Sequence, residues 1–132
     1  MRIKNLYGKE VNKSFSKYAI NWDRKVSKPQ KRIKDIIRPY WEGQDVYEEL
    51  LIPSSRLRVD LVNFTLNIAI EVSPSQHTSY NKFFHKSYAG FNSSIDRDKD
   101  KYSWLKLNKI DVVELFEDDL KLSDGEILDL IL

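Results

Sequence analysis

The chain of 132 residues contains no cysteine, which excludes disulfide bonds and thiolate metal sites. It also has no apolar run near the roughly 18 residues that a membrane-spanning helix needs. Its first ten residues, MRIKNLYGKE, lack the apolar centre of a signal peptide. We therefore expect an intracellular protein that is neither secreted nor bound to a membrane.

The composition, 41% hydrophobic and 32% charged, predicts a globular chain rather than a disordered one. Its length favours a single domain with one modest hydrophobic core. The sequence has no internal repeat and no recognisable module that reads nucleic-acid sequence, such as a zinc finger. If the chain binds nucleic acid, its sequence specificity is expected to be modest or to come from a partner or a homodimer.

The net charge of +2 hides a strong asymmetry along the chain. Residues 1–34 contain eleven Lys or Arg and two acids (+9), whereas residues 111–132 contain eight acids and one lysine (−7). A basic front end is the electrostatic footprint expected for a phosphate backbone, and a solvated tail without a partner is the alternative. The residues expected to bind nucleic acid are Lys13, Lys17, Arg24, Lys25, Lys28, Lys31, Arg32 and Arg58.

Helical and strand-like patterns alternate along the chain. Ser27 suits an N-cap and Pro29 a first turn, so apolar residues at helical spacing predict a helix over about residues 28–38. Two helical pieces are expected between about residues 79 and 108, and a final helix or tail over 123–132. The predicted strands span Val46–Ile52, Leu57–Phe64, Asn67–Val72 and Asp111–Phe116.

This order predicts an α/β fold, with a small mixed β-sheet flanked by helices in the sequence α-β-β-β-α-β. Residues 1–26 are expected to form a basic N-terminal arm or a short helix. Residues 27–132 then form the main domain, which ends in an acidic tail.

The second and third predicted strands contain the most informative pattern. If they form a hairpin that turns at Thr65-Leu66, Asp60 lies directly opposite Glu71, with Cβ atoms roughly 4.5–5.5 Å apart. Arg58 and Ser73 share their face. The opposite face is then a core face that contains Val59, Leu61, Ile68, Ile70 and Val72.

Two carboxylates that face each other across strands repel, so something must offset the repulsion. A divalent cation bound by Asp60 and Glu71 would do so, and oxygen ligands suit Mg²⁺ or Mn²⁺. Such a metal polarises a phosphoryl oxygen and lowers the pKa of a bound water. The alternative is a structural cluster in which one carboxylate pairs with Arg58.

The order of elements, with Val59-Asp60 on one strand and Ile70-Glu71-Val72-Ser73 on the next, resembles the PD-(D/E)XK nuclease superfamily. The similarity covers about residues 27–117 and is greatest to the branch of very-short-patch-repair-like and small restriction-like endonucleases. That branch often has a Gln-His pair after the acidic strand, here Gln76-His77. It also often has an Asp, Lys and Leu spaced like Asp98, Lys101 and Leu105 ahead of the last strand.

The resemblance implies a metal-dependent endonuclease and a role for each matching residue. Asp60 would be the central metal ligand, and Glu71 a second ligand or a water-positioning group. His77 would act as a general base or transition-state donor, and Gln76 would orient water or a phosphate. Asp98 and Lys101 would face the cleft from the following helix.

Gln30 falls where the first helix of this superfamily often presents Glu or Gln to the metal, although it equally suits a capping box with Ser27. The lysine usual two residues after the acid is Ser73 here, so its role would pass to Gln76, His77 or Lys101. For Asp98 and Lys101 the alternative is a solvated helix face, because the run 96–101 alternates in charge.

Three functions therefore compete. The first is a metal-dependent endonuclease that acts on DNA in preference to RNA. The second, suggested by the missing lysine, is a nuclease-fold module that binds nucleic acid without cutting it. The third, suggested by the asymmetric charge, is a structural subunit of a larger complex.

Overall fold

The computed structural model describes residues 1–73 and 99–132. A four-stranded sheet lies at its centre, and its strands stand side by side in the order of the chain. All neighbouring strands are antiparallel except the last two, which are parallel. The strands are β3 (Val46–Leu51), β4 (Arg58–Asn63), β5 (Ile68–Val72) and β6 (Asp111–Leu115).

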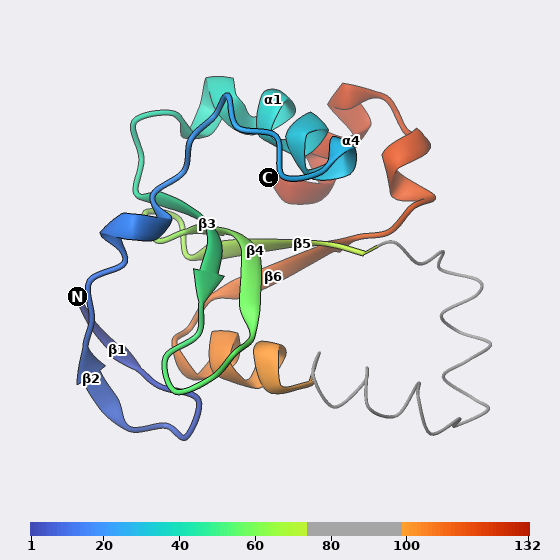
Figure 1. Ribbon diagram of the computed structural model, residues 1–132. Coiled ribbons are helices and arrows are strands. Elements are labelled where there is room, and N and C mark those ends of the chain that lie inside the picture. Colours follow the sequence, from blue (N-terminus) through green and yellow to red (C-terminus); the bar gives the residue numbers. More distant parts are fainter. Residues whose placement is uncertain (74–98) are drawn as a thin grey trace, which may run out of the picture.

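Helices cover both faces of this sheet (Figure 1). Helices α1 (Lys28–Trp41) and α4 (Asp124–Ile131) lie on one face, and a helical segment over residues 99–107 lies on the other. The 3-10 turn η2 (Asp119–Lys121) precedes α4. The predicted α/β class, with its mixed sheet flanked by helices, is confirmed.

Each face of the sheet has its own hydrophobic cluster. Ile37 of α1 and Ile127 of α4 pack on Leu61 of β4, and all three side chains are fully buried. On the opposite face, Trp104 packs with Val62, which is also fully buried. Because both faces are covered, a polar side chain on this sheet is shielded from water unless it lies near an end of its strand.

Helix α1 begins as the sequence predicts and ends later. Ser27 is the N-cap, its hydroxyl accepts a hydrogen bond from Gln30 N at 3.3 Å, and a proline lies in the first turn. The helix continues past Pro39 to Trp41, although proline removes one backbone donor from the helix. Trp41 is fully buried, and this packing accounts for the extra turn.

The β4–β5 hairpin has the predicted register. Leu61 pairs with Ile70 and Asn63 with Ile68, as a turn centred on residues 65–66 requires. The side chain of Asn63 holds this turn, because its Oδ1 accepts hydrogen bonds from the backbone N–H groups of residues 65 and 66 at 2.8 and 3.0 Å. An Asx turn therefore replaces the Asn-Gly chemistry of short hairpins.

The N-terminal region differs from the expected arm or short helix. It forms a hairpin of β1 (Arg2–Lys4) and β2 (Glu10–Asn12), followed by the 3-10 turn η1 (Ser16–Tyr18). Ile3 and Phe15 are only 5% exposed and belong to the cluster around Trp104. Too few apolar residues recur with a clear period here to predict strands from sequence, yet these two anchor the segment to the sheet.

Among the described residues, no helix is both long enough and apolar enough to cross a membrane.

The packing of the N-terminal region predicts a large difference between two aromatic residues. Phe15→Ala should lower the free energy of unfolding by about 3–5 kcal/mol, because it empties a buried aromatic site. Tyr7→Ala, at a side chain that is 80% exposed, should change it by less than about 0.5 kcal/mol. Urea unfolding of both variants measures this, and equal small effects would mean that residues 1–26 are a solvated arm.

Candidate active site

Asp60 and Glu71 lie side by side near the end of the β4–β5 hairpin, as the predicted register requires. Each carboxylate accepts a hydrogen bond from the backbone of the other strand. Asp60 N donates to Glu71 Oε2 at 3.2 Å, and Val72 N donates to Asp60 Oδ2 at 2.8 Å. These bonds hold the two acidic groups together despite their repulsion.

Glu71 is the more buried of the two, with 7% of its surface exposed. Burial, together with the negative charge of Asp60, raises the pKa of its carboxyl group to about 8. Lys101 opposes this shift, since its Nζ lies 2.9 Å from Glu71 Oε1. At neutral pH the Asp60–Glu71 pair therefore holds a proton much of the time.

Lys101 belongs to the helical segment 99–107, which lies on the opposite face of the sheet from α1 and α4 (Figure 1). Its ammonium group forms an ion pair with the carboxylate of Glu71. The family resemblance predicts a cleft-facing lysine at this position; the structure shows that Lys101 pairs with Glu71, and its role in a cleft stays a prediction. At Lys101, therefore, the charged run is not simply a solvated helix face, because this side chain pairs with Glu71.

Gln30 reaches the same place from the first turn of α1. Its side chain is 96% buried, and its Nε2 donates to the backbone carbonyl of Asp60 at 3.4 Å. Its side chain also lowers the pKa of the Glu49 carboxyl group, against the effect of burial. Ser27 accepts only the Gln30 backbone N–H, because the Gln30 side chain is engaged with Asp60, so the expected capping box is incomplete. Contact between Gln30 and a metal stays a prediction.

Glu49 also belongs to the site, although the sequence does not predict this residue as a member. In the register of β3 and β4 it falls opposite Asp60, between the pairs Glu48–Leu61 and Leu50–Val59. Burial raises the pKa of its carboxyl group, and the charge of Asp60 adds to the increase. Its backbone has φ +50°, a left-handed conformation that is uncommon outside glycine.

This left-handed residue explains an error in the predicted faces. The pattern of alternation places Val59 on the same face as Leu61, but Val59 packs in the cluster around Trp104. Leu50, which follows the left-handed residue on β3, packs in that same cluster. The change of backbone conformation at Glu49 therefore coincides with a switch of faces that period-two reasoning cannot anticipate.

Neighbouring Glu48 provides a contrast with the acidic pair. It is 3% exposed, and Lys34, which is fully buried, donates to it at 2.8 Å. The same ammonium group donates to the carbonyl oxygens of Asn21 and Arg24, so its three hydrogens are satisfied. This ion pair is structural and connects α1, β3 and the segment before α1.

The remaining predicted catalytic residues, Gln76, His77 and Asp98, lie outside the described residues. Of the predicted nucleic-acid-binding residues, several have partners within the fold. Arg32 donates to carbonyls before α4 and pairs with Asp124 at 3.2 Å, while Lys31 pairs with Asp35. Arg24 pairs with Glu48 at 3.7 Å.

The alternative to a metal was a structural ion pair between Arg58 and one of the two carboxylates. The guanidinium of Arg58 does not form this pair. It donates to the backbone carbonyl of Glu49 at 2.9 Å, and its Cζ lies 5.8 Å from the centre of the Tyr18 ring. Within residues 1–73 and 99–132, the cation paired with Glu71 is Lys101.

The donor set suits a hard divalent cation in its chemistry. Mg²⁺ commonly binds through one or two carboxylates, and water or substrate phosphate completes its octahedron. Asp60 and Glu71 supply two carboxyl groups that could hold such an ion once the shared proton is lost. Within residues 1–73 and 99–132, no group of three or more His, Asp or Glu side chains is arranged to hold a metal ion by itself.

No family model, curated protein or solved structure matches this chain.

The raised pKa of Glu71 predicts how stability varies with pH. The folded chain holds a proton between the ordinary pKa of 4.5 and about 8, whereas the unfolded chain does not. Stability therefore falls as the pH rises through this window. In EDTA, Glu71→Gln should be more stable than the parent at pH 8–9, with the difference shrinking toward pH 4–5.

Denaturant melts from pH 4 to pH 9 measure this effect, with Glu117→Gln as an exposed control that removes the same charge. A Glu71→Gln difference that does not vary with pH would contradict the raised pKa.

The left-handed backbone of Glu49 predicts a difference between glycine and alanine. Both Glu49→Gly and Glu49→Ala remove the carboxylate, but only glycine adopts φ +50° without strain. The glycine variant should be more stable than the alanine variant by about 1 kcal/mol. Chemical denaturation of the two proteins tests this, and an alanine variant at least as stable as the glycine one would show that residue 49 is unstrained.

Proposed function

We propose that this chain is a Mg²⁺- or Mn²⁺-dependent endonuclease that hydrolyses phosphodiester bonds, with DNA favoured over RNA. The observation that carries the proposal is the convergence of four polar residues from four separate elements. Gln30 from α1, Asp60 from β4 and Glu71 from β5 meet at one end of the sheet, and Lys101 joins them from the helical segment 99–107.

The convergence supports the resemblance to PD-(D/E)XK nucleases, because all four residues stand at positions that match motifs of that superfamily. The lysine expected two residues after the acid is Ser73 here. Lys101 brings an ammonium group to the same carboxylate from a different element, at 2.9 Å. A cation beside Glu71 is therefore retained although the motif position has changed.

A bound divalent cation would polarise the scissile phosphate and lower the pKa of a water molecule near it. Asp60 and Glu71 would hold the ion. Lys101 would contribute a positive charge close to the reacting phosphate, where charge develops in the transition state.

Glu71 has a further property that suits this chemistry. A carboxyl group with a pKa of about 8 exchanges a proton near neutral pH, where general acid–base catalysis is most effective. Binding of a cation would displace that proton, because the positive charge favours the carboxylate form. Gln30 fixes the position of Asp60 through its backbone carbonyl and restrains Glu49 on the other side.

A module that binds nucleic acid without cutting it is the second candidate. Its specific support is the Lys101–Glu71 ion pair, which offsets part of the repulsion in the acidic pair without a metal. In a non-catalytic protein this ion pair would be permanent and purely structural.

A cleavage assay distinguishes the two candidates. Supercoiled plasmid, branched DNA and RNA are incubated with the full chain and Mg²⁺, Mn²⁺ or EDTA. Metal-dependent cutting should be lost in Asp60→Asn and retained in Asp129→Asn, which removes the same charge from an exposed position on α4. Lys101→Met should reduce turnover by about 10²- to 10³-fold, the usual effect of removing one group that stabilises transition-state charge.

The second measurement is DNA affinity in EDTA, which separates binding from chemistry. Glu71→Gln should reduce turnover much more than it weakens binding. Salt-sensitive binding with no cleavage in any metal would establish the non-catalytic module instead, and equal cleavage by the parent and Asp60→Asn would place the chemistry elsewhere.

A further inference from the structure

A small hollow lies between the N-terminal region and the end of β3, outside the carboxylate cluster. Its volume is about 160 Å³. Apolar and aromatic side chains form most of its wall, and hydroxyl groups and two lysines complete it. Its lining residues are Lys13, Ser14, Phe15, Lys17, Tyr18, Leu51, Ile52, Pro53 and Ser54.

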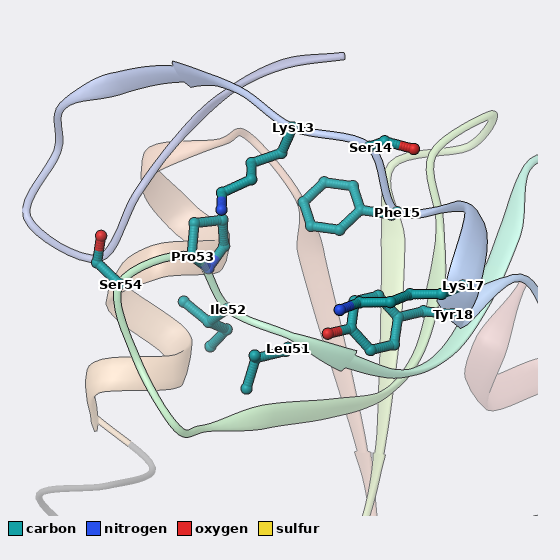
Figure 2. A pocket seen from close by; sticks show the side chains of 9 residues that line it. All are labelled: Lys13, Ser14, Phe15, Lys17, Tyr18, Leu51, Ile52, Pro53 and Ser54. Atoms are coloured by element: carbon teal, nitrogen blue, oxygen red, sulfur yellow. The ribbon is translucent and has the colours of Figure 1, made fainter.

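The two lysines place positive charge on opposite sides of this hollow. Figure 2 shows the ammonium ends of Lys13 and Lys17 directed toward the space between the Phe15 ring and Ile52. In the described part of the chain no carboxylate lies within 4.0 Å of either lysine. Lys17 Nζ instead lies 5.3 Å from the centre of the Tyr18 ring. Both charges are thus available to an anion that enters the hollow.

The size of the hollow limits what can enter it. A cavity of about 150 Å³ accommodates one benzene ring, so this hollow suits a single six-membered ring rather than a fused pair of rings. A ligand that combines such a ring with a negative charge on each side would match both the apolar wall and the two flanking lysines. An unstacked pyrimidine base with its neighbouring phosphates has this chemistry.

The hollow is connected to the proposed active site through one residue. The guanidinium of Arg58 lies beside the Tyr18 ring, and it donates to the carbonyl oxygen of Glu49 at 2.9 Å. Glu49 faces the carboxylate cluster, while Leu51, two residues further along β3, lines the hollow. The hollow and the acidic cluster are therefore two residues apart along β3.

We propose that this hollow binds one unstacked pyrimidine base of a single-stranded nucleic acid, whose flanking phosphates are neutralised by Lys13 and Lys17. The inference rests on the proposed function for its substrate class, and it adds a preference for unpaired strands or distorted duplexes. Paired bases are stacked within a duplex, so they cannot enter without first being unstacked.

Fluorescence anisotropy of labelled 12-mers with the full chain in EDTA tests the proposal without requiring catalysis. The probes are single-stranded oligothymidylate, a duplex of equal length and an abasic strand of equal charge. Oligothymidylate should bind about tenfold more tightly than the abasic strand, consistent with the usual contribution of a base–aromatic contact. The double variant Lys13→Ala/Lys17→Ala should lose at least that factor for oligothymidylate.

The matched control is Lys4→Ala/Lys9→Ala, which removes two exposed lysines of the same N-terminal hairpin outside the hollow. Equal losses of affinity in the two double variants would show that the effect comes from positive charge in general, and this would overturn the proposal. Equal affinity for the abasic strand would also overturn it, as would a preference for an acidic tyrosine-containing peptide over oligothymidylate.

The binding result and the cleavage result are independent. The binding measurement needs no metal, so the difference in affinity between oligothymidylate and the abasic strand should persist in EDTA, where nothing is cut. A chain that cuts DNA but shows no difference between the two double variants retains the nuclease function and loses this base site. A chain that binds the base at this hollow but never cuts is the non-catalytic module.

Discussion

Two carboxyl groups, those of Asp60 and Glu71, are held beside each other in a largely buried position by the backbone of the β4–β5 hairpin. Their mutual repulsion and burial favour the neutral form of Glu71, raising the pKa of its carboxyl group to about 8. A proton, the ammonium group of Lys101 or a metal ion must compensate for this excess negative charge. Compensation by a proton, by Lys101 or by a metal ion corresponds to three different states of the site.

The surrounding structure serves to hold this arrangement. Clusters on both faces of the sheet fix the hairpin register, and a slip of one residue would move both acidic groups into an apolar layer. The buried Lys34–Glu48 ion pair positions α1, so that Gln30 reaches the carbonyl of Asp60. The segment 99–107 packs through Trp104 and so presents Lys101 to Glu71.

Sequence reasoning succeeded where a regular period controls the structure. The strands, the start of α1 and the register that brings Asp60 beside Glu71 all follow from spacing. Gln30 and Lys101, which only the family resemblance singles out, also contact this pair, while their roles stay predictions. Sequence reasoning failed where a single residue interrupts the regular alternation of side chains along a strand. The left-handed backbone of Glu49 has no signal in sequence, so its place in the site and the reversed face of Val59 were missed. The N-terminal hairpin was missed because long-range packing of Ile3 and Phe15, rather than local pattern, defines it.

Calorimetric titration of the full chain with Mn²⁺ at pH 7, in two buffers of different ionisation enthalpy, measures metal binding and proton release together. The account predicts that one ion binds per chain and displaces a fraction of a proton from Glu71, and that Glu71→Gln binds more weakly without proton release. Absence of binding, or binding that releases no proton and is unchanged in Glu71→Gln, would contradict the claim that this acidic pair is a metal site.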